Sequence, residues 1–324
     1  MSAIDDAADR TRAGTSALKS ALKSALKSAV HCPPVLPASP VRQPQSTMPD
    51  SPPPPRHWFS SEYVEEMQRF LGPDACRRLA VYSLPAGFCL TVIVPVFNEC
   101  QTIQEVLDRL VETGLPMQIL LVDDGSSDGS GELLDQIYKQ FPQSHPDTEL
   151  MLLRHAENRG KGTAIRTAIE HARGDVVVIQ DADSEYSPED FRSLLQPLLH
   201  DEADVVYGTR YGHCDRQLSP WWHQAVNRLI TNLASMAIGP KLSDVETCYK
   251  MTRREHLQTI LPDLKEARFG IEIELTARLA RLGLRFTERP IRYHHRWYDA
   301  GKKITWRDGV AALACILRYG LLKR

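Results

Sequence analysis

Short apolar runs alternate with helical segments from Leu90 onward, and this alternation is the feature that most restricts the fold. The apolar runs span Leu90–Val96, Gln118–Val122, Leu150–Leu153, Val176–Gln180 and Val205–Tyr207. The helical segments between them are Gln101–Glu112, the residues after Ser130, Gly162–Ala172 and Pro188–Leu199. Such runs are typical of buried parallel strands covered by helices on both faces. The sequence therefore predicts an α/β fold with a mostly parallel central sheet flanked by helices.

The chain divides into four predicted parts. Residues 1–57 combine three Ala-Leu-Lys-Ser repeats with a Pro-rich stretch, a composition that buries too little apolar surface to become ordered. We expect a disordered tail there, with a weak membrane-surface helix as the alternative. Residues 58–89 are predicted to be a helical lead-in, and 90–304 to be one α/β domain. Residues 305–324 are predicted to form an amphipathic helix that lies in a membrane interface or packs on the domain.

Cysteine usage and the shortness of the apolar runs indicate the compartment. The seven cysteines are odd in number and include no Cys-x-x-Cys pair, which favours a reducing compartment over disulfides or a zinc site. The first residues show no apolar signal-peptide core, and no run approaches the roughly 18 apolar residues of a membrane span. We therefore expect a cytoplasmic protein that can bind peripherally to the cytoplasmic face of the membrane.

Charge is distributed unevenly along the chain. The formal net charge is -2, yet the segment from Lys250 to Arg324 holds 17 Lys and Arg against 8 Asp and Glu. A basic C-terminal segment suits a phosphate or an anionic membrane surface, and an acidic remainder suits a cation. Solvated surface charge is the alternative explanation. No nucleic-acid partner is expected.

Polar residues follow the first two predicted strands, at the sheet edge where ligands bind in parallel sheets. The first strand runs into Pro95-Val-Phe-Asn-Glu, in which Asn98 can cap the next helix together with Gln101. Glu99 can then accept hydrogen bonds from a ribose or a base. The second strand ends at Asp123-Asp124-Gly-Ser-Ser-Asp-Gly, which suits nucleotide hydroxyls but also an ordinary turn and helix cap.

A glycine-rich segment, Asn158-Arg-Gly-Lys-Gly162, precedes the third predicted helix. Its two glycines allow the backbone to approach a diphosphate, and Lys161 or Arg159 can supply positive charge. The segment is too short for a Walker loop, and the first strand is not followed by a dinucleotide-binding glycine pattern.

The fourth predicted strand ends in Asp181-Ala-Asp183, and Glu185 continues the same spacing. In an extended chain residues i and i+2 point to one side, so two carboxylates are predicted to converge where their repulsion requires a cation. Oxygen-only ligands favour Mg²⁺ or Mn²⁺. A chance Asp-x-Asp in a surface loop is the alternative, and the three preceding motifs disfavour it.

The order Pro-x-x-Asn-Glu, Val-Asp-Asp-Gly-Ser, Asn-x-Gly-x-Gly and Asp-Ala-Asp resembles family-two glycosyltransferases of the GT-A fold. The segments Tyr207–Tyr211 and Asp244–Lys250 are similar to those of dolichyl- and polyprenyl-phosphate sugar synthases. The resemblance covers roughly Leu90 to Tyr319 and implies a single GT-A catalytic domain.

The resemblance also implies roles for individual residues. Those implied for the nucleotide are Pro95, Asn98, Glu99, Asp123 and Asp124. Asp181 and Asp183 are implied as metal ligands, and Glu185 stands where related synthases use Gln, which leaves the third ligand open. The acceptor phosphate is implied to contact Arg210 and Arg228, and Lys302 of the basic C-terminal segment is expected to add positive charge there. Asp183 and Asp244 are the implied catalytic residues.

The predicted function is metal-dependent, inverting transfer of a hexose, mannose or glucose, from a GDP- or UDP-sugar to a polyprenyl or dolichyl phosphate. A phosphate nucleophile needs no general base, since its second pKa of about 6 leaves it mostly dianionic at pH 7. Asp244 is then expected to bind sugar hydroxyls. If the acceptor is instead a sugar or another alcohol, Asp244 becomes the leading base candidate.

Two other classes remain as alternatives. A nucleotidyltransferase also binds nucleotide and metal on an α/β sheet, but it requires a Gly-rich basic loop after the first strand, which Pro95–Glu99 lacks. A non-catalytic nucleotide-sugar sensor is disfavoured by the intact carboxylates of Asp181 and Asp183. Metal-dependent hydrolysis of a sugar nucleotide would exclude the sensor.

Overall fold

The computed structural model describes residues 58–145, 148–211, 221–295 and 306–321. The predicted tail, residues 1–57, lies outside the described residues. Among the helices of the described ranges, none is long and apolar enough to cross a bilayer.

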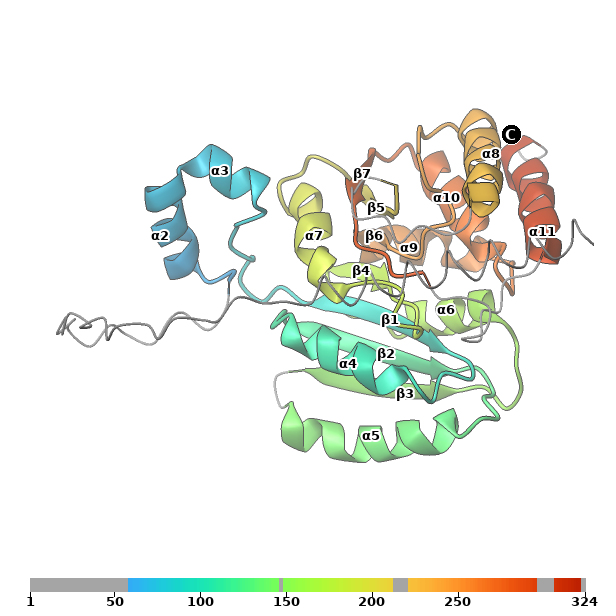
Figure 1. The fold of residues 1–324 in the computed structure, drawn as a ribbon, viewed down its shortest axis with the longest axis horizontal. Helices are drawn as coiled ribbons and strands as arrows, with labels where there is room; N and C mark the ends of the chain where they lie inside the picture. The colour runs from blue at the N-terminus through green and yellow to red at the C-terminus, as the bar shows by residue number, and fades with distance from the viewer. Residues whose placement is uncertain (1–57, 146–147, 212–220, 296–305, 322–324) are drawn as a thin grey trace, which may run out of the picture. The chain divides into compact units, whose positions relative to one another are not determined.

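A seven-stranded sheet forms the centre of the domain, in the order β3-β2-β1-β4-β6-β5-β7 (Figure 1). The strands are β1 (Leu90–Val96), β2 (Met117–Asp123), β3 (Glu149–Arg154), β4 (Val176–Ile179), β5 (Val205–Thr209), β6 (Lys250–Arg253) and β7 (Phe286–Pro290). The first five coincide with the predicted apolar runs to within two residues at each end. β6 pairs antiparallel with both β4 and β5, and every other pairing is parallel. The prediction of a mostly parallel α/β sheet is confirmed.

Ten α-helices surround the sheet in the described residues. They are α2 (Ser61–Leu71), α3 (Pro73–Arg78), α4 (Ile103–Glu112), α5 (Ser130–Ser144), α6 (Lys161–Ile169), α7 (Phe191–Leu199), α8 (Trp221–Ile238), α9 (Arg254–Ile260), α10 (Ile271–Arg281) and α11 (Trp306–Ile316). Short 3₁₀ turns, Pro188–Asp190 and Leu261–Asp263, precede α7 and follow α9, and a π-helical turn η4 (Leu317–Leu321) follows α11. Figure 1 shows α4 and α5 beside β1–β3, and α8, α10 and α11 beyond β5 and β7.

Helix spacing explains how the layers pack. In α4 the buried side chains are Ile103, Val106, Leu107 and Leu110, the i, i+3, i+4, i+7 pattern of one apolar face. The strands β1, β2, β4 and β5 are buried along nearly their whole length and build the main core with the helices. A second, smaller core joins α8, α10 and α11.

The lead-in helices are attached to α7 by hydrogen bonds. Tyr82 Oη donates to the Arg192 carbonyl at 2.7 Å, and Arg192 Nε donates to the Ala80 carbonyl at 2.6 Å. Gln196 Nε2 donates to the Arg77 carbonyl at 2.7 Å. These contacts hold the segment before β1 at the α7 side of the sheet.

Strand register determines where the site lies. Val96 of β1 pairs with Asp123 of β2, which pairs with Arg154 of β3, so these three strands end at one edge. β4 runs parallel to β1 and ends at Ile179, which pairs with Ile93. The four predicted polar motifs therefore follow strands that point to the same edge, where α/β sheets bind ligands.

Candidate active site

Asn98 shapes the turn after β1. Its backbone is in the left-handed region, with φ of 54°. Its Oδ1 accepts the Ser127 amide at 2.8 Å, and its own amide donates to Ser126 Oγ at 3.0 Å. The predicted helix cap by Asn98 and Gln101 is wrong, because Thr102 is the N-cap of α4. Asn98 instead joins the loops that follow β1 and β2.

Glu99 lies between the β1 and β4 loops. Its amide donates to Ser130 Oγ at 2.9 Å. The Thr102 hydroxyl lies 2.8 Å from Glu99 Oε2 and 2.7 Å from the Ala182 carbonyl oxygen. Thr102 therefore connects the predicted nucleotide residue Glu99 to the predicted metal segment, while Pro95 remains within β1.

Asp124 anchors the glycine-rich loop. It is buried and accepts the amides of Arg159 at 2.9 Å and Gly160 at 2.7 Å. Its Oδ1 also lies 2.6 Å from His155 Nδ1. Asp123 accepts an amide in its own turn, 3.0 Å away. Backbone amides of the protein thus donate hydrogen bonds to both carboxylates that were predicted to bind the nucleotide. Contact of Asp123 and Asp124 with a nucleotide remains a prediction.

His155 was missed by the sequence analysis. It follows β3, and its other ring nitrogen, Nε2, lies 3.0 Å from Thr167 Oγ1 on α6. The available signal was a polar residue directly after the third strand, because polar motifs also follow the first, second and fourth strands.

Gly160 and Gly162 permit a close approach to the segment before α10. Gly160 has φ of 92°, and a Cβ there would overlap the Ala267 carbonyl oxygen. A Cβ on Gly162 would overlap the Glu266 carbonyl oxygen. Only glycine fits at these two positions, and Lys161 between them is the first residue of α6.

Lys161 bridges two carboxylates. Its Nζ lies 2.7 Å from Asp181 Oδ1 and 2.9 Å from Glu272 Oε1, while Lys250 Nζ lies 2.5 Å from Glu272 Oε2. Burial by itself would lower the pKa of Lys161, but the charges of Asp181 and Glu272 outweigh it and raise that pKa well above its usual value. Lys161 is therefore a fixed positive charge beside the Asp-Ala-Asp motif.

The charge of Asp181 acts on Asp183, although the backbone differs from the prediction. The strand ends at Ile179, and the turn that follows begins at Ala182 and includes Asp183, so the chain is not extended through the motif. Burial and the neighbouring charges of Asp181 and Glu185 raise the pKa of Asp183 to about 8. Repulsion of this kind is what a bound cation relieves, so the residues fit a divalent metal.

The metal ligands are not already arranged as a set. Among the described residues, no three His, Cys, Asp or Glu side chains are placed to share one metal ion. Asp181 is paired with Lys161, and Glu185 Oε2 accepts the Tyr293 hydroxyl at 2.6 Å. A metal bound through these carboxylates would therefore share them with Lys161 and Tyr293.

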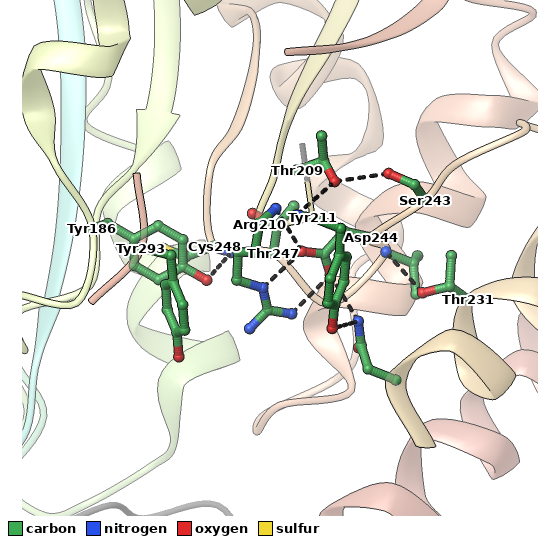
Figure 2. A network of polar contacts seen from close by, with 12 residues as sticks. Tyr186, Thr209, Arg210, Tyr211, Thr231, Ser243, Asp244, Thr247, Cys248 and Tyr293 are labelled. Carbon is green, nitrogen blue, oxygen red and sulfur yellow. Dashed lines mark hydrogen bonds and ion pairs between the residues drawn. The ribbon is translucent and has the colours of Figure 1, made fainter. Parts of the chain in front are cut away.

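Arg210, which is partly exposed, forms a bidentate ion pair with the buried Asp244 (Figure 2). Arg210 Nε and Nη2 donate to the two Asp244 oxygens, each at 2.7 Å. Burial alone would raise the pKa of Asp244, but the Arg210 guanidinium outweighs it and holds that pKa below its ordinary value. A carboxylate held in this way is poorly suited to accept a proton.

Asn227 of α8 completes this network. Its Nδ2 donates to Asp244 Oδ1 at 3.1 Å and to the Tyr211 hydroxyl at 2.8 Å. The Arg210 guanidinium lies 5.3 Å from the centre of the Tyr293 ring, within range of a cation–π contact. Because Tyr293 also bonds Glu185, this one side chain contacts both the predicted acceptor residue and the predicted metal segment.

Glu246 is a second acidic residue of this region that the sequence analysis did not single out. Burial raises its pKa above the ordinary value, which the Arg210 charge only partly offsets. It belongs to the Asp244–Lys250 segment, so the motif pointed to the region but not to this side chain.

The remaining predicted residues are more scattered. Arg228 is exposed on α8, next to Asn227. Lys302 lies outside the described residues. In the basic segment, Arg292 is paired with Asp190 through Nη2 at 2.9 Å.

The comparisons with known proteins agree with this geometry. The chain belongs to glycosyl transferase family 2, whose model matches residues 91–261. It is therefore a glycosyltransferase.

Two relatives have names that specify a prenyl-phosphate or polyprenol acceptor for those proteins. An undecaprenyl-phosphate mannosyltransferase of Micrococcus luteus is 29% identical over 238 residues, covering 72% of this chain and 94% of that protein. A polyprenol monophosphomannose synthase of Mycolicibacterium smegmatis is 29% identical over 217 residues, covering 65% of this chain and 79% of that protein.

Solved structures share the fold. Glucosyl-3-phosphoglycerate synthase from Mycobacterium tuberculosis, determined with Mn²⁺, UDP and phosphoglyceric acid, superposes with a TM-score of 0.55 at 18% identity, covering 82% of this chain and 84% of that one. A mannosyltransferase from Pyrobaculum calidifontis, determined with GDP-Man and Mn²⁺, gives 0.51 at 22% identity, covering 79% and 70%. The GT-A fold expected from the motifs is confirmed.

Proposed function

We propose that this enzyme transfers a hexose, mannose or glucose, from a GDP- or UDP-sugar to a polyprenyl phosphate, with inversion at the anomeric carbon. The observation that carries the proposal is the position of Tyr293. Its hydroxyl bonds Glu185 of the metal segment and its ring contacts the Arg210 guanidinium. A carboxylate of the predicted metal segment and a cation suited to a phosphate therefore contact the same side chain. The names of the two relatives support the same acceptor class.

Asp181 and Asp183 would hold a Mg²⁺ or Mn²⁺ ion, with Glu185 as the candidate third ligand. When bound, the ion would stabilise the charge of the leaving nucleoside diphosphate. The raised pKa of Asp183 supports this assignment, because burial and the negative charges of Asp181 and Glu185 disfavour its ionised form, which a bound cation would favour. Lys161, 2.7 Å from Asp181, stands where it can contribute further positive charge to the diphosphate.

The reaction is proposed to be a single displacement. An oxygen of the acceptor phosphate forms a bond to the anomeric carbon, the bond from that carbon to the diphosphate breaks, and the configuration inverts. The acceptor is mostly dianionic at pH 7, because its second pKa is about 6, so no protein base is needed. This agrees with Asp244, whose lowered pKa and pairing with Arg210 suit positioning rather than proton transfer.

Arg210 is proposed to meet the acceptor phosphate through the side of the guanidinium that faces away from Asp244. Burial alone would lower its pKa, but Asp244 raises that pKa well above the usual value, so the charge is permanent. Arg228 and Lys302 are proposed to assist. Because the acceptor is a lipid, we also propose a cytoplasmic protein in peripheral contact with the cytoplasmic face of the membrane.

A panel of sugar nucleotides tests the proposal. GDP-mannose, UDP-glucose and their relatives would be incubated with Mg²⁺ or Mn²⁺ and a short, soluble polyprenyl phosphate, and the product anomer determined by NMR. We expect one donor to give a sugar phosphodiester of inverted configuration. Retention of configuration, or transfer only to alcohols, would overturn the proposal.

Transfer to an alcohol acceptor is a second candidate function, and Glu246 favours it. Its pKa is raised by burial, so it is a better general base than Asp244. With an alcohol acceptor, kcat should fall as the pH drops through the raised pKa of Glu246, and Glu246→Gln should remove most activity. With a phosphate acceptor, the same variant should retain activity.

A further inference from the structure

Four charged side chains form a line that starts at the Asp-Ala-Asp motif. In order along the line they are Asp181, Lys161, Glu272 and Lys250, from the β4 loop, α6, α10 and β6. Lys161 Nζ lies 2.7 Å from Asp181 Oδ1 and 2.9 Å from Glu272 Oε1. Lys250 Nζ lies 2.5 Å from the other oxygen of Glu272. Negative and positive charges therefore alternate from the predicted metal motif to β6.

Exposure falls along this line. The side chains of Asp181 and Lys161 are 24% and 14% exposed, whereas those of Glu272 and Lys250 are 6% and 3% exposed. Lys161 is therefore the cation of the line that a ligand can reach. Glu272 is almost fully buried, so its contact with Lys161 is the route by which it can affect such a ligand.

Lys250 holds the Glu272 carboxylate in place. Lys250 Nζ also donates to the Thr247 carbonyl, and it lies 5.0 Å from the centre of the Tyr207 ring. Glu272 is the second residue of α10, so its backbone belongs to a regular helix. One oxygen of Glu272 is thus fixed by a buried cation, and the other lies next to Lys161.

Lys161 needs a partner of this kind. A lysine ammonium is a compact charge on a flexible four-carbon stem, so one ion pair does not fix its position. Its other partner, Asp181, is a predicted metal ligand, and a divalent ion on that carboxylate would repel the ammonium. Glu272 supplies negative charge that the predicted metal ligands do not include.

The same contact leaves Lys161 able to bind a ligand. In the described part of the chain Glu272 Oε1 accepts no hydrogen bond, so its contact with Lys161 is a close charge pair rather than an aligned hydrogen bond. An ammonium has three N–H donors. They can turn towards a phosphate oxygen while the charge stays beside Glu272.

We propose that Glu272 is a positioning residue, which holds the Lys161 ammonium beside the Asp-Ala-Asp motif for the diphosphate of the donor. Stability alone does not account for the line of charges, because apolar residues of similar volume often stabilise a core as well as buried ion pairs do. The proposal rests on the proposed function, which supplies the diphosphate, but its test measures nucleotide binding without sugar transfer.

Isothermal titration calorimetry of the full chain with GDP and with UDP, at saturating Mn²⁺ and without acceptor, tests the proposal. Lys161→Met should raise the Kd about tenfold or more, because a charge-assisted contact is lost. Glu272→Gln should raise the Kd at least about threefold, although it removes a negative charge that by itself repels the nucleotide. The double variant should bind no more weakly than Lys161→Met, since Glu272 acts through Lys161.

Glu288→Gln is the matched control. Glu288 of β7 is partly buried and accepts the amides of Ser243 and Asp244, so this variant also neutralises a glutamate that the fold uses. The control should leave the Kd unchanged. Urea unfolding of every variant measures the accompanying change in the free energy of unfolding.

Three results would overturn the positioning role. Glu272→Gln that is less stable but binds nucleotide as the wild type does would make Glu272 purely structural. A double variant weaker than Lys161→Met would mean that Glu272 contacts the nucleotide itself. A control that loses as much affinity as Glu272→Gln would trace the effect to general loosening of the domain.

Glu272→Asp takes the place of Glu272→Gln if the latter does not fold. It keeps the buried charge but shortens its reach, so the Kd should again rise, and an unchanged Kd would contradict the proposal. A wild type that binds neither nucleotide would overturn both this proposal and the donor of the proposed function. Nucleotide binding with the expected pattern, but no transfer to a polyprenyl phosphate, would contradict the proposed function alone.

Discussion

Lys161 Nζ lies 2.7 Å from Asp181 Oδ1, so the first residue of α6 is ion-paired with the first carboxylate of the predicted metal motif. The same ammonium lies 2.9 Å from Glu272 at the start of α10. One lysine thus ties the glycine-rich loop, the β4 loop and α10 together. The positive charge of Lys161, which the glycine-rich loop carries, therefore acts on the Asp-Ala-Asp motif.

Replacing Lys161 with Met should destabilise the protein by about 3 kcal/mol, because Asp181 and Glu272 would lose a largely buried partner cation. Urea unfolding at pH 7 measures the change. Lys265→Met, at an exposed position, is the control and should stay within about 0.5 kcal/mol. Equal free energies of unfolding of the two variants would show that the ion pairs of Lys161 with Asp181 and Glu272 do not stabilise the fold.

Asp183→Ala should reduce transfer by at least about a hundredfold, because a metal contributes several kcal/mol to the stabilisation of transition-state charge. The fold should persist, since burial and the charges of Asp181 and Glu185 already disfavour the ionised Asp183 carboxylate in the folded protein. Steady-state rates in Mg²⁺ or Mn²⁺, with Asp108→Ala on the exposed side of α4 as control, measure the effect. Near-normal turnover would remove Asp183 from the metal site.

Arg228→Ala should raise the KM for the acceptor about tenfold to a hundredfold, because a charge-assisted bond to phosphate contributes roughly 1.5–3 kcal/mol. The KM for the donor should change little. The exposed Arg69 of α2 provides the control, Arg69→Ala. An unchanged acceptor KM, or an equal loss for the donor, would place Arg228 outside the acceptor site.

Gly160→Ala should destabilise the protein by at least about 2 kcal/mol more than Gly129→Ala, through a clash. Both glycines have positive φ, 92° and 95°, so both alanines carry backbone strain of about 1 kcal/mol. Only at Gly160 would the added Cβ overlap another backbone, that of Ala267, whereas nothing lies within 4 Å at Gly129. Thermal unfolding of the two variants decides, and equal losses would contradict the close packing of the loop.

Deleting residues 1–57 should leave kcat with a short, soluble acceptor nearly unchanged. Their composition predicts no core, and the domain retains its attachments from Trp58, whose indole donates to the Thr113 carbonyl at 3.2 Å. Steady-state kinetics of the full chain and the truncated chain provide the measurement. Loss of most activity would assign the tail a catalytic role.

Local sequence patterns predicted most of the fold. Apolar runs of strand length separated by amphipathic segments fixed the first five strands, because burial on both faces leaves a continuous apolar signature. The strands β6 and β7 were not predicted. Their sequences are Lys-Met-Thr-Arg and Phe-Thr-Glu-Arg-Pro, and neither contains a continuous apolar run.

The site was predicted in part for the same reason. Residues that directly follow a strand, such as Glu99 and Asp181, were placed at the correct edge because strand direction is shared in a parallel sheet. Their partners were not predicted. Asn98 was expected to cap its own helix and instead bonds Ser127, 29 residues away.

The positions of β1 to β5 and of the polar residues that follow them could be predicted from the chain alone, since periodicity and strand ends are local properties. The antiparallel insertion of β6 between β4 and β5 could not, because it depends on contacts between distant segments. The same holds for the pairing of Arg210 with Asp244, 34 residues away, and of Lys161 with Asp181. Such pairs depend on how distant segments pack. A charge that folding removes from water needs an opposite charge close by in space, and that partner can lie anywhere in the sequence.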